Sequence, residues 1–445
     1  MAQEFGEEEV EEPVENTDES LNKMQLLLNR VKQGVFGALY VMAKETQESH
    51  LSHLVFSTIE FILFLAFPFH KVSHFPWNSK YMNLWIEFIN IFEVETYLVL
   101  DGIWVDLMYI VTFLSVSITL GLALFVAYTL SGTRSKFQSV WILRILRSVA
   151  PFFVTTMYIP LLKVFVSVFH CKFGDGCWEG FGLIGSMSAL LIGILFVALA
   201  NLVAATFYDP DPTSVNWGSR PHSRGDLMYL AFTTILTIVF GILGKSAEYY
   251  PFLVSLLLVG GLCTTYLFTM YIPYYSFTYS CIRVGQLWVF SWASICLLIA
   301  KLYGDYRSDA AGSILFFLGC PFVIFTGVMT ARMRRDWIAR TPVHKLNSAY
   351  EVEIKIRFYL SVMTPYQQVH GTSFEARLED KEFQTRLKHA EKMLSVALQT
   401  PHLADSSILH LFAFQFYFTH LRDVATSQDV RCLPCDSCML MIRVW

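Results

Sequence analysis

Three polar side chains, Glu60, Lys163 and Asn201, interrupt apolar stretches of this sequence. An ionisable group inside a membrane segment is costly, and such groups commonly line ion paths, sense signals or pair with one another. Two interpretations are open for Glu60 and Lys163. Either they form a structural pair or extend toward the membrane surface, or they mark a path for an ion or a solute. Because such residues are few, we favour the structural interpretation.

The C-terminal cysteines suggest a metal site. Cys432, Cys435 and Cys438 supply three thiolates at ligand spacing. A structural zinc site uses four ligands, however, and no suitable fourth ligand lies nearby. We therefore expect residues 426–445 to form a disordered Cys-rich tail without a metal.

A second cysteine pair lies in the polar loop CKFGDGCW. Cys171 and Cys177 form a disulfide if this loop faces an oxidising compartment. The alternative is two free thiols at a turn that the neighbouring glycines define. Both interpretations are open.

Motifs for catalysis are missing from the sequence. It has no glycine-rich phosphate loop, no nucleophile elbow and no H-E-x-x-H motif. We expect a protein that is not an enzyme, with no catalytic residues, no cofactor and no nucleic-acid partner.

The composition indicates an all-α, polytopic membrane protein. Hydrophobic residues make up 54% of the chain and charged residues 16%, whereas soluble domains carry roughly a quarter charged residues. About 20 apolar residues are needed for a helix to cross the bilayer. Within a transmembrane domain over 51–333, eight segments come close to this length: 51–69, 107–129, 149–170, 183–207, 226–244, 251–272, 283–303 and 312–331.

A ninth apolar segment, residues 82–100, contains three glutamates. Each of them would be costly at the centre of the membrane. We therefore expect an interfacial or re-entrant helix here.

Basic residues predict the orientation, because short loops rich in Lys and Arg stay on the cytoplasmic side. With the N-terminus inside, most connecting Lys and Arg residues fall on that side, including Arg220, Arg224 and Arg283. The sequence therefore predicts that both termini are cytoplasmic, and we expect the plasma membrane rather than an internal one. Residues 1–20 form an acidic leader, which we expect to be disordered, and 21–50 a juxtamembrane amphipathic helix.

A cytoplasmic helical region is predicted over 334–425, where charge density rises after the basic segment ARMRRDW. Residues 348–363 favour a helix, because Glu351 with Lys355 and Glu353 with Arg357 form pairs at helical spacing. The alternation of apolar residues there also fits a strand.

Two further helices are predicted after this segment. Residues 380–399 carry an apolar stripe at helical spacing that ends before Pro401. Residues 408–421 are too short and too polar for a membrane span, so we expect them to pack on 380–399. Four aromatic residues in this helix are candidates for an interaction surface: Phe412, Phe414, Phe416 and Phe418.

Three stretches give the chain a family resemblance: HSRGD at 222–226, YEVEIKIRF at 350–358 and the long segment at 390–423. Over most of 50–425, the sequence resembles the tiny macrocysts protein B and C family of protist membrane proteins. The resemblance implies that the last segment begins a region of tetratricopeptide-like repeats.

Together these features predict a non-enzymatic signalling or scaffold protein. Its partners are the lipid bilayer, through the apolar spans, and a protein that binds residues 345–425. The alternative is an ion channel or solute transporter that uses Glu60 and Lys163.

Overall fold

The chain is helical throughout the residues that the structure describes. This computed structural model describes residues 50–70, 77, 80–92, 110, 113–114, 116–117, 120–121, 124, 152, 156–166, 181–206, 217–244, 247–303, 311–361 and 381–417. Every regular element in these ranges is a helix, so the predicted all-α class is confirmed for them. Predictions for the acidic leader, the 21–50 helix and the Cys-rich tail lie outside the described residues.

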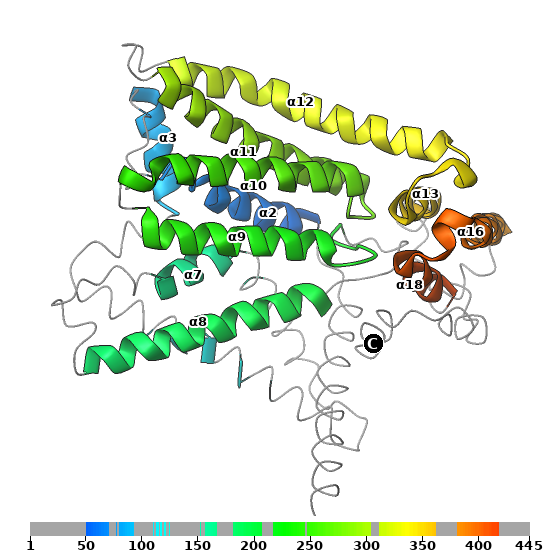
Figure 1. Ribbon diagram of the computed structural model, residues 1–445, viewed down its shortest axis with the longest axis horizontal. Helices are drawn as coiled ribbons and strands as arrows, with labels where there is room; N and C mark the ends of the chain where they lie inside the picture. The colour runs from blue at the N-terminus through cyan, green and yellow to red at the C-terminus, as the bar shows by residue number, and fades with distance from the viewer. Residues whose placement is uncertain are drawn as a thin grey trace, which may run out of the picture.

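Five long helices form the membrane domain, and they run side by side in Figure 1. Each is long and apolar enough to cross a bilayer, which supports the multi-pass prediction. The predicted total of eight spans stays a prediction. The five helices are α8 (Phe181–Thr206), α9 (Arg224–Leu243), α10 (Tyr250–Tyr271), α11 (Phe277–Tyr303) and α12 (Ala311–Arg340).

Two shorter helices occupy parts of other predicted spans. Helix α2 covers His50–Leu65, and its apolar part, His53–Leu65, is shorter than a full span. Helix α7 covers Tyr158–Val166. Most of the predicted span 107–129 lies outside the described residues.

Helix α3 (Lys80–Asn90) occupies the start of the segment predicted to be interfacial. It has 11 residues, so it is too short to span the membrane. One of its faces is buried through Met82 and Ile89, whereas Leu84 on another face is 73% exposed. Trp85 of α3 packs edge-on against Phe69, in the turn that follows α2.

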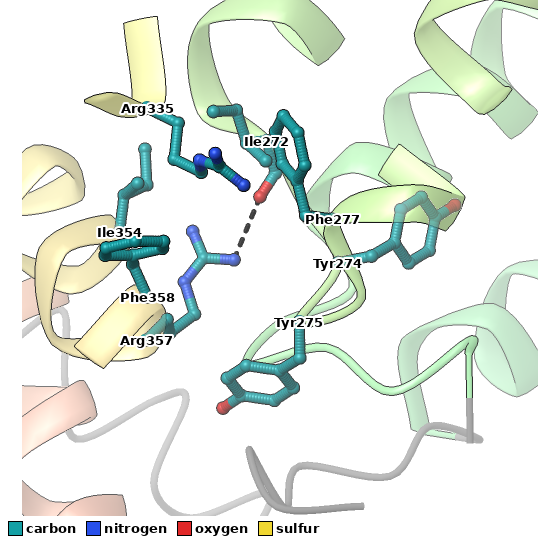
Figure 2. A pocket seen from close by; sticks show the side chains of 8 residues that line it. All are labelled: Ile272, Tyr274, Tyr275, Phe277, Arg335, Ile354, Arg357 and Phe358. Carbon is teal, nitrogen blue, oxygen red and sulfur yellow. Dashed lines mark hydrogen bonds between the residues drawn. The ribbon is translucent and has the colours of Figure 1, made fainter. Parts of the chain in front are cut away.

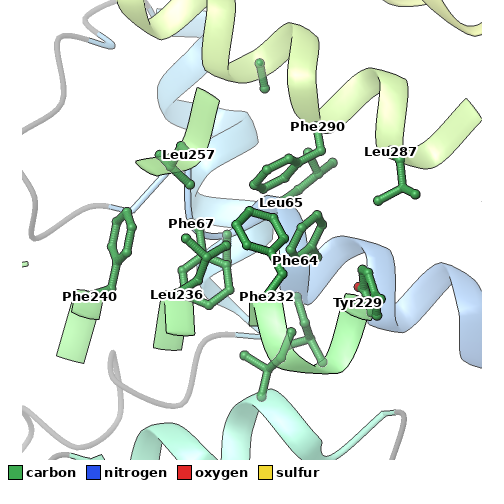
Figure 3. Packing of buried hydrophobic residues seen from close by; sticks show 14 of the residues in the cluster. Phe64, Leu65, Phe67, Tyr229, Phe232, Leu236, Phe240, Leu257, Leu287 and Phe290 are labelled. Atoms are coloured by element: carbon green, nitrogen blue, oxygen red, sulfur yellow. The ribbon is translucent and has the colours of Figure 1, made fainter. Parts of the chain in front are cut away.

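Aromatic side chains fill the core between α2, α9, α10 and α11 (Figure 3). The ring of Phe64 stacks on Phe290 with centroids 3.9 Å apart, and Phe232 meets both rings edge-on. Gly260 of α10 permits this packing, because a Cβ at that position would lie 2.0 Å from Cε2 of Phe232. Small residues at helix contacts let backbones approach closely in membranes.

Helix α12 continues without a break from Ala311 to Arg340, and Pro321 lies inside it. Its 30 residues measure about 45 Å, which exceeds the roughly 30 Å thickness of the hydrocarbon core. The basic segment at 331–337 is therefore part of the helix and does not end it. The predicted span 312–331 covers only the apolar part.

The C-terminal module lies beside the end of α12 (Figure 1). It consists of α13 (Ala349–Ser361), α16 (Lys381–Gln399), α17 (Pro401–Ala404) and α18 (Ser407–Phe416). Its apolar side chains form a second core together with Ile272 after α10 and Ile338 of α12, and this cluster is distinct from the core of the membrane helices. Of the predicted segment 348–363, residues 349–361 are thus helical rather than extended, and α16 ends before Pro401 as its sequence predicts.

Helix α18 packs on α13 as well as on α16. Phe412 and Phe416 are buried in the core of the module, at 7% and 2% exposure. They belong to the core because α18 is covered on two sides, so they are not the exposed interaction surface that the sequence suggests. The side chains of Phe414 and Phe418 lie outside the described part of the chain.

Candidate functional site

A buried ion pair joins α2 to α11. The Arg283 guanidinium donates to both carboxylate oxygens of Glu60, at 2.9 and 3.3 Å. Glu60 is 8% exposed and Arg283 is 5% exposed. A bidentate contact of this kind satisfies both charges away from water. Glu60 therefore pairs with Arg283 instead of the partner, Lys163, that the sequence suggests.

Further polar groups support this pair. The Arg283 guanidinium lies 4.8 Å from the ring centroid of Tyr229. Gln286, one turn further along α11, accepts a hydrogen bond from the Ser57 hydroxyl at 3.1 Å and donates to the Ser57 carbonyl at 3.3 Å. These contacts fix α2 against α11 through polar side chains.

The other two intramembrane candidates lie in different surroundings. The Lys163 ammonium is 5.1 Å from the ring centroid of Phe67, and the residue is buried. Asn201 donates to the Val197 carbonyl in the preceding turn of its own helix, at 2.8 Å. The structure thus gives each of Glu60, Lys163 and Asn201 a separate contact.

A second polar assembly lies where the C-terminal module meets the membrane helices, and we call it the junction. Arg357 of α13 donates to the Ile272 carbonyl at 2.9 Å and to the Tyr271 carbonyl at 3.3 Å. These carbonyls end α10, where backbone acceptors lack a partner within the helix. Ile272 has a left-handed backbone with φ of 42°, a conformation that is rare for a β-branched residue. Arg357 therefore holds the chain at the turn from α10 to α11.

Glu353 completes the charge balance of the junction. Its carboxylate lies 3.5 Å from Nε of Arg357 and 3.7 Å from Nε2 of His222. Glu353 is 1% exposed, so its charge depends on these neighbours. The predicted pair of Glu353 and Arg357 is present, and it is buried rather than solvated.

Residues at the start of α9 and just before it also contact α13. Arg224 donates to the Tyr350 hydroxyl at 2.6 Å, and the Tyr350 ring lies 4.6 Å from that of Tyr271. Burial lowers the pKa of His222, and the charges of Arg357 and Arg224 lower it further. The Glu353 carboxylate raises this pKa, by less than burial lowers it but by more than either arginine does, so His222 is neutral at neutral pH.

The end of α12 is also tied to α13. Glu351 forms an ion pair with Arg334 of α12. Lys355 donates to the carbonyls of Ala339 and Thr341, both at 2.7 Å, and burial lowers its pKa. A lysine at the carboxyl end of a helix satisfies unpaired carbonyls and complements the helix dipole. Glu351 and Lys355 thus bind α12 and not each other.

A small cavity of about 20 Å³ lies within the junction (Figure 2). A volume of this size holds about one water molecule. Arg335 and Arg357 border it, and the Arg335 guanidinium lies 3.7 Å from the ring centroid of Phe277. The cavity is therefore too small for an organic ligand.

One hydrogen bond continues the network from the junction into the membrane helices. The Tyr274 hydroxyl donates to Asp226 at 2.5 Å, and Asp226 also pairs with Arg220. Burial raises the pKa of Tyr274 to about 12, so this hydroxyl keeps its proton at neutral pH.

Several sequence candidates cannot be compared with the structure. The disulfide candidates Cys171 and Cys177 lie outside the described residues, as do Cys432, Cys435 and Cys438. Within the described ranges, no three His, Cys, Asp or Glu side chains converge as metal ligands.

The chain has relatives among characterised proteins. In an alignment of 348 residues that covers 73% of the chain, it is 23% identical to tiny macrocysts protein B of Dictyostelium discoideum. In an alignment of 334 residues that covers 69% of the chain, it is 21% identical to tiny macrocysts protein C of the same organism. The similarity supports membership of the tiny macrocysts protein B and C family.

The tiny macrocysts relatives are much longer than this chain. The matched region covers 23% of protein B and 22% of protein C. No family model matches the chain, and no solved structure matches it. The family similarity therefore concerns a part of these proteins, and the activity of the whole relatives does not transfer with it.

Proposed function

We propose that this chain is a non-enzymatic signalling or scaffold component of a membrane, in which the membrane helices hold the C-terminal module in a fixed orientation as a docking surface for a protein. The module acts as the start of a tetratricopeptide-like helical region on the cytoplasmic side. The plasma membrane is the expected location, with both termini inside the cell.

The junction carries this proposal. A flexible linker would suffice to tether a module, but here the contact buries Glu353 and Arg357 and uses the end of α10 as an acceptor. Burying charges costs free energy unless their partners are well placed. Such a contact fixes one orientation of the module relative to the membrane, which is what a platform for a partner requires.

The exposed face of α16 is the surface that we assign to the partner. The buried faces of α16 and α18 form the module's core, whereas Lys388, Lys392 and Val396 lie on the outer face of α16 and are exposed. The partner surface is therefore polar with isolated apolar side chains, as in many transient interfaces.

The rival function, transport through Glu60 and Lys163, has less support. The charge of Glu60 is neutralised by Arg283 through two hydrogen bonds. Lys163 contacts Phe67 on another part of the fold. A path for an ion would need these groups to share a solvated cavity.

Reconstitution tests the two functions against each other. We expect vesicles containing the full-length protein to show no ion conductance, and proximity labelling in cells to mark a partner that is lost in the double variant Lys388→Glu with Lys392→Glu. Conductance that disappears in Glu60→Gln would refute the scaffold and establish the rival.

A further inference from the structure

One face of α12 is directed away from the other helices along its whole length. Within the apolar part, Ile314, Leu318, Phe322 and Phe325 are 55%, 70%, 77% and 65% exposed. Helix α12 packs mainly on α11 and contacts α10 only slightly. In a bilayer this outer face meets acyl chains.

The same face continues into the basic end of the helix. Arg332 follows Ile314, and Arg340 follows Phe322, after about five full helical turns. Both arginines are exposed, and this spacing places them on the same side of α12 as Ile314 and Phe322. Because α12 is about 15 Å longer than the hydrocarbon core, its last ten residues or so reach the layer of lipid headgroups.

Arg332 and Arg340 have no ionic partner among the residues that the structure describes. Their neighbours are already engaged, since Arg334 pairs with Glu351 and Arg335 pairs with Asp336. The acidic Asp336, which lies between the two arginines on this face, is thereby neutralised within the helix.

Two apolar side chains accompany these charges. Trp337 is 45% exposed and Met333 is 60% exposed, in the same last turns of α12 as Arg332 and Arg340. Tryptophan is enriched at the depth of the headgroups, because its ring is apolar and its N–H is polar.

We propose that Arg332, Trp337 and Arg340 form a binding site for the headgroup of an anionic phospholipid. The two guanidinium groups bind the lipid phosphate or carboxylate, and the indole and Met333 contact the lipid at the depth of its headgroup. Charge complementarity and the continuity of this face with the lipid-facing surface identify the occupant as a lipid. The Arg334 guanidinium lies 5.0 Å from the ring centroid of Trp337 and pairs with Glu351, so the site adjoins the module.

Native mass spectrometry of the full-length protein tests this assignment. The protein is purified in mild detergent with equal amounts of phosphatidylserine and phosphatidylcholine, and the retained lipids are counted. The variant Arg332→Gln with Arg340→Gln removes both charges. Lys388→Gln with Lys392→Gln removes two exposed charges from α16 as a matched control, and Arg332→Lys with Arg340→Lys preserves the charge.

We expect the wild-type protein, the control and the lysine variant to retain phosphatidylserine in preference to phosphatidylcholine. Each basic residue near an anionic surface strengthens binding about fivefold, so the glutamine variant should lose up to roughly 30-fold in preference. The proposal is overturned if the glutamine variant keeps the wild-type preference, if the control loses as much, or if the wild-type protein does not distinguish the two lipids. The proposal would also be overturned if a soluble polyanion displaced phosphatidylserine only at low ionic strength while the glutamine variant retained as much phosphatidylserine as the wild-type protein.

Discussion

Replacing Arg357 by methionine should detach the C-terminal module from the membrane helices. Methionine keeps much of the length of the side chain but removes the charge. The change leaves Glu353, 1% exposed, without its closest cation. It also leaves the carbonyls of Tyr271 and Ile272 without their donor at the end of α10.

The expected cost follows from these losses. Removing one partner of a buried ion pair costs about 3–5 kcal/mol, because the other charge stays buried and uncompensated. This corresponds to a roughly 100- to 4,000-fold increase in the population of the undocked state. The double variant Glu353→Gln with Arg357→Met should recover part of the loss, since no buried carboxylate remains.

Hydrogen exchange of the full-length protein in nanodiscs measures this population. Amides of 349–361 should exchange faster in Arg357→Met, whereas those in the centre of α9 and α11 should keep their protection. Lys388→Met, which removes an exposed charge from α16, is the control and should exchange like the wild-type protein. Unchanged protection of α13 in Arg357→Met, or a double variant that exchanges faster than the single one, would refute this account of the junction.

Three further outcomes can be checked by simpler measurements. Glu60→Gln should lower the thermal stability of the purified protein by an amount equivalent to about 3–5 kcal/mol, because the buried Arg283 charge loses its partner; an unchanged melting temperature would contradict this. Gly260→Ala should destabilise the protein by about 1–3 kcal/mol, because the new Cβ clashes with Phe232. Gly185→Ala is the control and should leave the stability unchanged, because no atom lies within 4 Å of its new Cβ. Burial lowers the pKa of His222 in the folded protein below 6.5. Docking of the module should therefore be constant above pH 6.5. It should weaken as the pH falls below 6.5 and through the folded-state pKa, because protonation of His222 favours the undocked state. Hydrogen exchange of the α13 amides, measured at several pH values, should show this pH dependence in the wild-type protein and a weaker one in His222→Gln.

The sequence predicted the membrane helices well, because the length of an apolar segment is enough to identify such a helix. Helices α8 to α10 follow the predicted apolar segments closely, since a bilayer demands about 20 such residues, whereas α11 begins before its predicted segment and α12 ends after it. The end of α12 was harder to predict, because basic residues mark the membrane boundary but do not stop a helix. The choice between helix and strand for α13 depended on the i,i+4 pairs, and only one of these, Glu353 with Arg357, forms.

Contacts between distant residues could not be predicted in this way. Arg283 counts in the sequence as a basic residue of a connecting loop, yet it lies inside α11 and pairs with Glu60, 223 residues away. The aromatic residues of α18 suggest an interaction surface, because the sequence does not reveal that α13 covers them. The segment HSRGD did mark one side of the junction, since His222 and Arg224 both contact α13.

The proline within α12 affects where this helix bends. Pro321 cannot donate a backbone hydrogen bond to the preceding turn, so the helix is easiest to bend there. The segment from Pro321 to Arg340 measures roughly 28 Å. A bend of about 10° at this point shifts the Arg340 end by about 5 Å. A bend of α12 inside the bilayer would therefore be transmitted to the module through the Arg334–Glu351 ion pair.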